Sequence, residues 1–433
     1  MPPADRPARC PARDAVEVRK LERLRTMLRE ALPANRFYAS KLARVRDPAS
    51  VGSFAEFAEW PFTFKEELVA AAASGAPGNL TWEPERYVRY HQTSGTHGRP
   101  LPVLDTAADW DWWMTCWRTI LDRGGVAPGD RVVVASSFGP YVGFWSGFEA
   151  VVRRGAAAIP AGGLTSLARL ELLRATGASV LLATPSYALH LAEVAADATI
   201  DLAAFDVRLV IVAGEPGGSV AATRSRIAQA WGADVLDHAG ATEVGPWGVG
   251  DLDGDGLDVI EEWFHPEFLS LETGAAAAPG ERAELVLTTL GRTGAPVIRY
   301  RTGDVVRPTW ALPADVEAGA CPWVRLAGGI LGRTDDMLVI RGVNVFPQAV
   351  EEIVRGFPEV VEHRLTACTR AGLDDLELEI EDRLGAPDRV ARELRVRLGL
   401  RVDVRGVPVG SLPRFEGKGR RFVDRRGQSG GNA

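Results

Sequence analysis

Short apolar segments alternate with helical stretches between about residues 85 and 300, and this alternation limits the possible folds more than any other feature. The apolar segments have the length and composition of strands, and the stretches between them carry apolar residues at helical spacing. Because such alternation is typical of βαβ units, it predicts largely parallel sheets. The strand-like segments are 131–135, 156–160, 180–184 and 209–213, and the helical ones include 167–176 and 221–231.

The pattern changes twice along the rest of the chain. From about 250 to 330, turn-rich strand-like segments at 283–289, 297–301 and 305–309 predict an antiparallel or barrel-like subdomain. After residue 335, strand-like segments at 337–341 and 376–380 and helical ones at 347–355 and 387–398 predict a small α+β domain. We therefore expect an α/β protein. A large N-terminal domain (1–334) would combine βαβ subdomains with a β-barrel-like subdomain, and residues 335–433 would form a small mobile α+β domain.

Charge and apolar pattern exclude several classes of protein. The formal net charge is −7, and because no basic stripe offsets the acidic excess, we expect no nucleic-acid partner. No run approaches the roughly 18 apolar residues that a membrane span needs, so we expect no membrane partner. The four cysteines are scattered without metal-ligand spacing, which favours a reducing, cytoplasmic setting.

Lysine is rare in this chain, since only four of the 50 basic residues are lysines: Lys20, Lys41, Lys65 and Lys418. Lys418 is the only one after residue 65, and a glycine flanks it on each side. A lysine in such a segment can reach into a site and bridge a carboxylate and a phosphate. A solvated basic tail is the usual alternative.

A glycine-rich loop follows the strand-like segment 87–91. Its glycines let the backbone close around a ligand, its hydroxyls can donate to phosphate oxygens, and its arginine neutralises charge. No Gly-Lys-Ser/Thr follows, so it is not a Walker loop, and a polar hairpin turn is the alternative. The loop consists of Ser94, Gly95, Thr96, His97, Gly98 and Arg99.

Two further motifs place a carboxylate where it can serve a nucleotide. Glu243 ends a motif that begins at His238, after the strand-like segment 235–237. At the mouth of a βα unit, such a carboxylate is well placed to hold Mg²⁺. Asp304, at an expected turn, can accept hydrogen bonds from both ribose hydroxyls. Taken alone, the first motif can be an N-capping Thr242 before a first-turn glutamate, and the second a β-turn aspartate.

The order and spacing of these motifs are far more specific than any one of them. Together they resemble the acyl- and aryl-CoA synthetase superfamily of adenylate-forming enzymes, and most closely its phenylacetate-CoA ligase branch. The similarity runs from about residue 85 to 425, and it is supported by the stretches 184–189, 213–216, 296–304 and 332–347.

The resemblance implies a nucleotide site. The loop from Ser94 to Arg99 would hold the β- and γ-phosphates of ATP, and Glu243 would help to hold Mg²⁺. Asp304 would bind the ribose hydroxyls with help from Arg333. The remaining nucleotide contacts would come from Gly214, Glu215 and Pro216 beside the adenine, and from Asp237, His238, Ala239, Gly240 and Thr242.

The resemblance also implies a two-step reaction. Lys418 would promote adenylation of a small, aromatic carboxylic acid with release of pyrophosphate. The C-terminal domain would then turn about Asp335, and the acyl group would pass to coenzyme A. The acid pocket would draw on Phe138, Gly139, Tyr141, Ala241 and Trp247. Apolar and aromatic residues of this kind more often belong simply to the hydrophobic core, which is the alternative.

Departures from the family pattern keep two alternatives open. His97 stands where a threonine is usual, and Ala239 stands where an aromatic commonly stacks on adenine. One alternative is another acid or acceptor, such as nitrite activated toward an aryl amine in secondary metabolism. The other is an inactive nucleotide-binding regulatory protein, although the retained Lys418 speaks against it. The oligomeric state stays open, with a homodimer among the possibilities.

Overall fold

The structure is a computed structural model that describes residues 13–72, 78–93, 100–136, 138–254, 256–336, 338–340, 343–370, 373–414 and 421–426. Its centre is a nine-stranded sheet with the order β13-β14-β9-β8-β7-β6-β5-β3-β4. The strands from β3 to β7 run parallel, and β8, β9, β14 and β13 extend the sheet in antiparallel fashion. These strands are β3 (Arg131–Val134), β4 (Ala157–Pro160), β5 (Val180–Ala183), β6 (Leu209–Ala213), β7 (Asp234–Ala241), β8 (Gly245–Val249), β9 (Leu257–Val259), β13 (Pro308–Thr309) and β14 (Arg325–Leu326).

Helices cover both faces of the parallel part of this sheet because its strands are apolar on both sides. In β3, Val132 and Val134 pack with residues of α5 and α6, whereas Val133 packs with residues of α7, α8 and α9. The predicted parallel sheet and helices are therefore confirmed. The helices are α5 (Ala107–Arg123), α6 (Val142–Arg154), α7 (Ser166–Thr176), α8 (Pro185–Asp197) and α9 (Ala221–Trp231).

A second, antiparallel sheet of four strands has the order β10-β11-β12-β15 and confirms the antiparallel character expected after residue 250. The expected strand at 297–301 is displaced, because β12 begins at Tyr300 after Arg299 adopts a left-handed backbone with φ 49°. The strand was hard to see because Arg301, Gly303 and Asp304 lack apolar alternation. The strands are β10 (Phe264–Ser270), β11 (Ala283–Thr289), β12 (Tyr300–Val306) and β15 (Gly332–Arg333).

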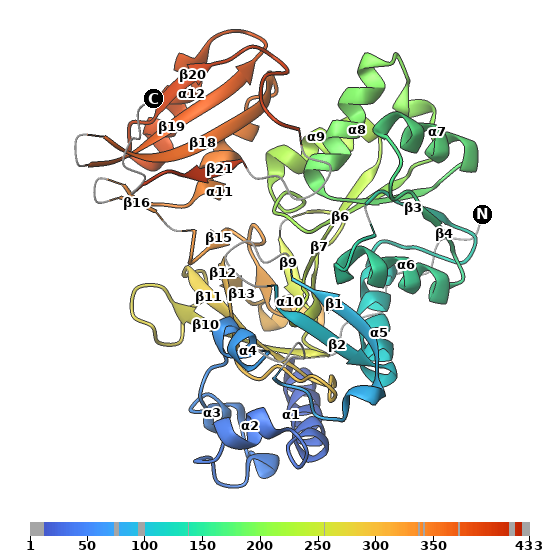
Figure 1. Ribbon diagram of the computed structural model, residues 1–433, viewed down its shortest axis with the longest axis vertical. Coiled ribbons are helices and arrows are strands. Elements are labelled where there is room, and N and C mark those ends of the chain that lie inside the picture. Colours follow the sequence, from blue (N-terminus) through green and yellow to red (C-terminus); the bar gives the residue numbers. More distant parts are fainter. Residues whose placement is uncertain are drawn as a thin grey trace.

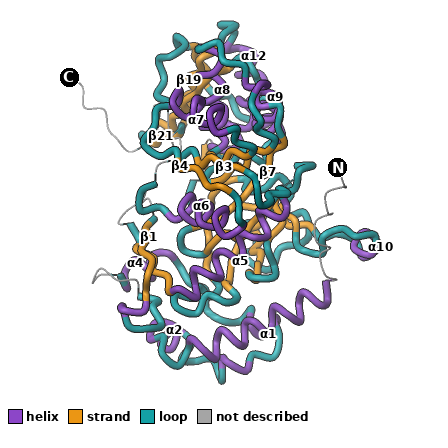
Figure 2. Tube along the Cα trace, turned by 90° about the vertical axis from the view of Figure 1, so that its right-hand side faces the viewer, coloured by secondary structure: helices purple, strands orange, loops and turns teal. Residues whose placement is uncertain are grey.

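Short elements and one long helix complete the large domain. Figure 2 shows α1 at the end of the molecule opposite the C-terminal domain. Among the described residues, no helix combines the length and apolarity needed to cross a membrane. The elements are α1 (Arg13–Ala31), α2 (Arg36–Lys41), α3 (Phe54–Phe57), α4 (Lys65–Ala71), α10 (Pro313–Glu317), the paired strands β1 (Tyr87–Gln92) and β2 (Pro102–Thr106), and 3-10 turns at Pro48–Ser50, Pro84–Arg86 and Leu202–Ala204.

The C-terminal part has its own core and its own sheet, with the order β20-β19-β18-β21 (Figure 1). Both predicted helices are confirmed, but β18 was missed. The outward residues of β18 and β19 are charged and pair across the strands, as Arg364 does with Glu379, so their sequences look polar. The elements are β16 (Leu338–Ile340), β17 (Val343–Val345), α11 (Pro347–Arg355), β18 (Val360–Arg370), β19 (Leu373–Asp382), α12 (Pro387–Leu398), β20 (Asp403–Gly406) and β21 (Phe422–Asp424).

Candidate active site

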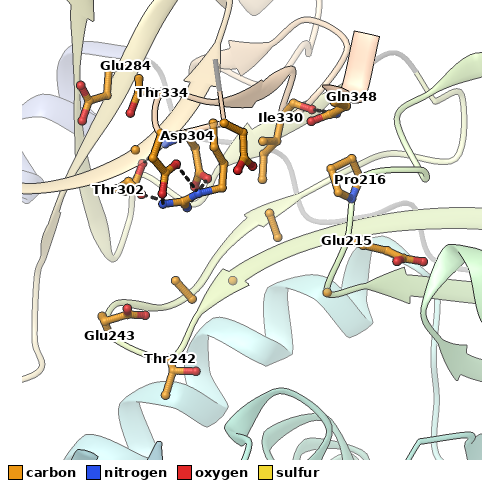
Figure 3. A pocket seen from close by; sticks show the side chains of 18 of the residues that line it. Glu215, Pro216, Thr242, Glu243, Glu284, Thr302, Asp304, Ile330, Thr334 and Gln348 are labelled. Atoms are coloured by element: carbon orange, nitrogen blue, oxygen red, sulfur yellow. Dashed lines mark hydrogen bonds and ion pairs between the residues drawn. The ribbon is translucent and has the colours of Figure 1, made fainter. Parts of the chain in front are cut away.

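A cavity of about 2130 Å³ lies where the two sheets of the large domain meet the C-terminal part. Its walls come from the ends of β6 and β7, from β12 and β15, and from α11, β18 and β21. Figure 3 shows Glu215, Glu243 and Asp304, which come from three different strands or strand ends, around this one space. The position of the cavity between domains is the one expected of a ligand site, and its volume exceeds the roughly 300–1,000 Å³ of a typical small-molecule pocket.

Glu243 lies in the turn that joins β7 to β8, and its side chain is 8% exposed. Its Oε1 lies 2.9 Å from Lys65 Nζ and accepts a 3.4 Å hydrogen bond from the hydroxyl of Tyr300. Burial, with the neighbouring Glu243 carboxylate, holds the pKa of Tyr300 well above its usual value. The expected βα unit is wrong, and so is the alternative of a helix capped by Thr242, because β7 continues through Ala241 and turns back into the antiparallel strand β8. Glu243 therefore stands in a hairpin.

A buried ion pair holds the β7–β8 hairpin in place. Arg292 lies 2.7 Å from Asp105, and both side chains are at most 1% exposed. Arg292 Nη1 also donates to the backbone oxygen of Glu243 at 2.7 Å. Burial raises the pKa of Asp105, and the Arg292 charge opposes that shift. Because an unpaired buried charge is costly, this pair locks the turn that carries Glu243.

Asp304 and Arg333 face each other across the β12–β15 pair. Arg333 Nη1 lies 3.2 Å from Asp304 Oδ1, and Arg333 Nε donates to Asp335 Oδ1 at 2.9 Å. Asp304 lies inside β12 and not at a β-turn, which corrects the expectation. It follows Gly303, whose φ of +76° bends the strand locally. All three charged residues line the cavity.

The carboxyl end of β6 forms another wall, made by Gly214, Glu215 and Pro216. Gly214 has a φ of +92°, and Glu215 Oε1 accepts a hydrogen bond of 2.7 Å from the backbone N–H of Ser186. That N–H is one of the free donors in the first turn of α8, so the helix fixes the carboxylate. The nucleotide contacts expected here do face the cavity.

Asp237, on β7, also borders the cavity. Its carboxylate accepts from Ser219 Oγ at 2.5 Å and from the backbone N–H of His238 at 3.0 Å. Burial nevertheless raises the pKa of Asp237 to about 6. The neighbouring residues expected in the nucleotide site, namely His238, Ala239, Gly240 and Thr242, line the same cavity.

The residues expected in the acid pocket divide into two groups. Tyr141 and Ala241 line the cavity. Phe138 and Gly139 do not, because Phe138 packs against Trp145 and Phe148, and Gly139 O accepts from the Trp145 indole. Trp247 is 1% exposed and belongs to the core. The wall toward α5 and α6 comes instead from residues that the sequence did not single out, Trp113, Trp117, Val142, Phe144 and Ser146.

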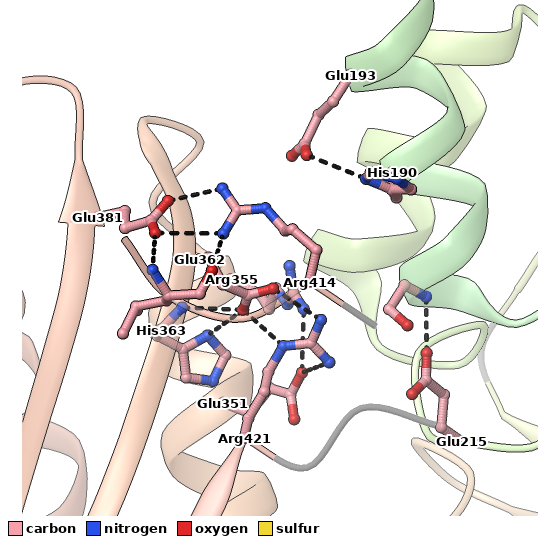
Figure 4. A network of polar contacts seen from close by, with 12 residues as sticks. His190, Glu193, Glu215, Glu351, Arg355, Glu362, His363, Glu381, Arg414 and Arg421 are labelled. Atoms are coloured by element: carbon pink, nitrogen blue, oxygen red, sulfur yellow. Dashed lines mark hydrogen bonds and ion pairs between the residues drawn. The ribbon is translucent and has the colours of Figure 1, made fainter. Parts of the chain in front are cut away.

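Two expected contributors, the loop Ser94–Arg99 and Lys418, lie outside the described residues. Thr93, next to that loop, and Arg421, after the segment that holds Lys418, both line the cavity. Arg421 pairs with Glu362 at 2.6 Å in a network of charges between the C-terminal part and α8 (Figure 4). Within the described ranges, no group of three or more metal-ligating side chains occurs.

Sequence reasoning missed Lys65 and Tyr300 as neighbours of Glu243. A signal was available for Lys65, since only four of the 50 basic residues of this chain are lysines. Lys65 is also the first residue of α4, the helix end at which a positive charge is unfavourable. Tyr300 stands beside the expected ribose-binding motif, but nothing local connects it with Glu243.

Comparison with known proteins gives a consistent result. The AMP-binding enzyme family matches residues 21–262, and the AMP-binding enzyme C-terminal domain matches residues 342–426. Phenylacetate-coenzyme A ligase from Escherichia coli (strain K12) is 32% identical over 431 residues, or 95% of each chain. The enzyme of that name from Pseudomonas putida is 30% identical over 430 residues, again 95% of each.

Solved structures agree with these matches. 2-Hydroxyisobutyryl-CoA ligase in the postadenylation state has a TM-score of 0.89 at 27% identity, covering 98% of this chain and 94% of that one. In the thioesterification state with 2-HIB-AMP and CoA, its TM-score is 0.72 at 28% identity, with coverage of 99% and 94%. With a family match over more than half of its residues and relatives at least 30% identical over 95% of its length, the chain belongs to the AMP-binding enzyme family.

Proposed function

We propose that this protein is an AMP-forming acid–CoA ligase that activates a small carboxylic acid with an aromatic or similarly apolar body. The acid would attack ATP to give an acyl-adenylate and pyrophosphate, and the acyl group would then pass to coenzyme A. The observation that carries the proposal is the single cavity shared by Glu215, Glu243, Asp304 and Arg333. Its aromatic wall at Trp113, Trp117 and Tyr141 supports an apolar acid.

The nucleotide would lie along one side of this cavity. Gly214, Glu215 and Pro216 would border the adenine, Asp304 with Arg333 would bind the ribose, and the loop from Ser94 to Arg99 would hold the terminal phosphates. Asp237, Ala239, Gly240 and Thr242 would complete the wall. The described residues of this set are carried by β7 and the turn after it, by β12 and β15, and by the end of β6, and such elements suit a site that works by positioning.

A Mg²⁺ ion fits this arrangement. Mg²⁺ bound with a nucleotide needs only one or two protein carboxylates, because phosphates and water supply the other ligands. Glu243 offers such a carboxylate to the cavity. Bound there, the ion would neutralise phosphate charge. Lys65, which now pairs with Glu243, would add a second positive charge near the reacting groups.

Electrostatics explains why cations must converge here. The acid and ATP are both anions, so their approach at the α-phosphorus is opposed by mutual repulsion. Lys418, carried by the C-terminal domain, would supply charge for adenylation and leave when that domain turns about Asp335. 2-Hydroxyisobutyryl-CoA ligase has been solved in both a postadenylation and a thioesterification state, and this chain is more similar to the postadenylation state.

The proposal is tested by measuring ATP–pyrophosphate exchange with aromatic, aliphatic and inorganic acids, with and without CoA. We expect exchange with a small set of apolar carboxylic acids, and acyl-CoA formation when CoA is added. If nitrite were the only acid that supports exchange, and an aryl amine were then consumed, the acid would be nitrite and the acceptor would be the amine. No exchange with any acid would contradict an enzymatic role.

Lys418→Ala tests the division of labour between the two steps. Adenylation should fall at least ~100-fold because the charge that meets the phosphates is gone. An isolated acyl-adenylate should still react with CoA at a rate near that of the unaltered protein. Lys41→Ala is the matched control, since Lys41 pairs with Glu67 and does not line the cavity. An equal loss of both steps would contradict the assignment.

A further inference from the structure

His238 lies on the face of β7 that points away from the expected adenine wall. Asp237, one residue earlier, faces the start of α9 and accepts from Ser219. His238 therefore faces the opposite side of the sheet, and its ring lies 4.6 Å from the ring of Trp117 in α5. The side chain is 6% exposed and lines the cavity. This is the side formed by α5 and α6, where the body of the acid would lie.

Hydrogen bonding fixes the tautomer of His238. Its Nδ1 lies 2.8 Å from the backbone oxygen of Gly248. A carbonyl oxygen can only accept, so Nδ1 must carry the proton, and Nε2 then presents a lone pair. Burial lowers the pKa of His238 to about 4, which keeps the ring neutral near neutral pH.

The Nε2 acceptor has no hydrogen-bond partner within the described part of the chain. Several polar side-chain atoms of the described residues are fully buried and have no partner, and His238 Nε2 is not one of them. Nε2 is therefore accessible from the cavity. Gly240 does not crowd this nitrogen, since even an added Cβ at that position would stay at van der Waals distance, 3.6 Å, from Nε2. A neutral acceptor therefore faces a part of the cavity that can admit a ligand.

The neighbouring polar groups on the α5 and α6 side of the cavity already form hydrogen bonds with protein groups. The Trp117 indole donates to Ser146 Oγ at 2.8 Å, and Ser146 Oγ donates to Gly143 O at 2.9 Å. The wall thus combines aromatic and aliphatic surface with one buried, directional acceptor. A site with this character recognises an apolar body that carries a hydrogen-bond donor.

We propose that His238 selects the acid by accepting a hydrogen bond at Nε2 from a hydroxyl or amino group on its apolar body. This inference rests on the proposed ligase function and specifies its substrate class as hydroxy- or amino-substituted acids. An acid without the donor leaves a buried acceptor unpaired, and such a loss is large compared with the loss of an apolar contact.

The test compares acids that differ only in the donor. For the full chain, kcat/KM in ATP–pyrophosphate exchange is measured for benzoate, phenylacetate and isobutyrate, and for their hydroxy-, amino- and fluoro-substituted forms at each position. Fluorine is close to a hydroxyl in size and cannot donate. We expect at least one hydroxy or amino acid to exceed both its parent and its fluoro analogue by roughly 10- to 100-fold. Equal rates across all such sets would overturn the inference.

Variants of His238 connect that preference to the residue. In His238→Phe, the ratio of donor-bearing acid to fluoro analogue should fall to roughly one. In His238→Gln, whose amide oxygen can accept, part of the ratio should return. His265→Phe is the matched control, because His265 is equally buried, stacks on Phe54 and does not line the cavity. Its ratio should remain that of the unaltered protein.

The possible outcomes separate the two proposals. Absence of exchange with every acid would contradict the ligase function and this inference together. Exchange without donor preference would contradict the inference alone, as would a His238→Phe variant that changes only the KM for ATP and does so equally for all acids. If His238→Phe fails to fold, the ratio in His238→Gln compared with that in His265→Phe still decides.

Discussion

At the scale of single residues, the ion pair between Lys65 and Glu243 joins an exposed lysine to a buried carboxylate at the wall of the cavity. The Lys65 side chain is 42% exposed and that of Glu243 is 8% exposed, so the lysine lies largely in solvent while its partner is buried. The position of Lys65 in the cavity wall suggests an electrostatic role toward an anionic ligand.

Lys65→Ala should lower kcat/KM for ATP in the exchange assay by roughly 10- to 100-fold, because a cation beside the phosphates is lost. Its melting temperature should change by less than about 2 °C, because Glu243 keeps the hydrogen bond from Tyr300 and faces the cavity. Lys41→Ala should change neither quantity. A large fall in melting temperature without loss of exchange would point to a structural role for Lys65.

Asp237 makes a prediction about pH. Its pKa rises from 3.8 when unfolded to about 6 when folded. Below about pH 4, the Asp237 carboxyl is protonated in both the folded and the unfolded state, so its burial costs no free energy of ionisation there. As the pH rises from about 4 to 6, the unfolded chain ionises first, and the stability that the protonated side chain contributed is lost.

Asp237→Asn should therefore stabilise the protein by up to about 3 kcal/mol at pH 7.5 and by little at pH 4. The amide can keep both hydrogen bonds if the Ser219 hydroxyl reverses its role. Urea unfolding at several pH values measures this difference. Asp234→Asn, at an exposed position of the same strand, is the control, and an equal effect at both pH values would contradict the prediction.

At the scale of elements, the β7–β8 hairpin decides where Glu243 points. Gly245 begins β8 with a φ of +121°, and a Cβ there would lie 3.0 Å from the Trp112 ring. The hairpin thus needs a residue without a side chain at this position, both for its backbone and for its packing against α5.

Gly245→Ala should cost about 1–3 kcal/mol of stability for the contact with Trp112, in addition to the cost of a positive φ in alanine. It should also lower exchange activity, because Glu243 is displaced. Gly232→Ala is the matched control. Gly232 has a φ of +59°, and a Cβ added there would meet nothing within 4 Å, so this variant should lose only about 1–2 kcal/mol and retain exchange. Similar exchange rates in the two variants would show that the hairpin tolerates the change.

At the scale of the whole molecule, the C-terminal part forms one side of the cavity, and its helix α11 packs against α9 and β15 of the large domain. Gln348 of α11 donates to Ile330 O, and Arg414 lies beside the carboxylate of Glu193 in Figure 4 while it pairs with Glu381 at 2.7 Å. Much of this contact is polar, and polar interfaces between domains allow relative motion.

Asp335→Pro tests the proposed hinge. Proline restricts φ and the conformation of the preceding residue, so formation of acyl-CoA from an isolated acyl-adenylate should slow at least ~10-fold, and more than adenylation does. Asp335→Ala removes the pairing with Arg333 and leaves the backbone free. It should spare the second step, and unchanged second-step kinetics in the proline variant would rule out a hinge there.

Much of the fold and part of the site could be predicted from sequence because their signals are local. The apolar pattern of β3 to β6 and the periodicity of α7, α9, α11 and α12 reflect burial along one segment. Glu243, Asp304 and Glu215 were found because each lies in a short motif. The sequence did not predict the polar strands β12 and β18 correctly. Residues of β12 line the cavity, and β18 pairs its charged residues with those of β19 across the sheet.

What the sequence by itself determined was the type of most elements, the family motifs and their chemistry. Tertiary structure decided which side chains share the cavity. It placed Lys65 beside Glu243, put Trp247 in the core, and turned the His238 ring toward Trp117 of α5. The physical reason is that side-chain direction depends on strand register and hairpin geometry, which are fixed by packing between segments far apart in the chain.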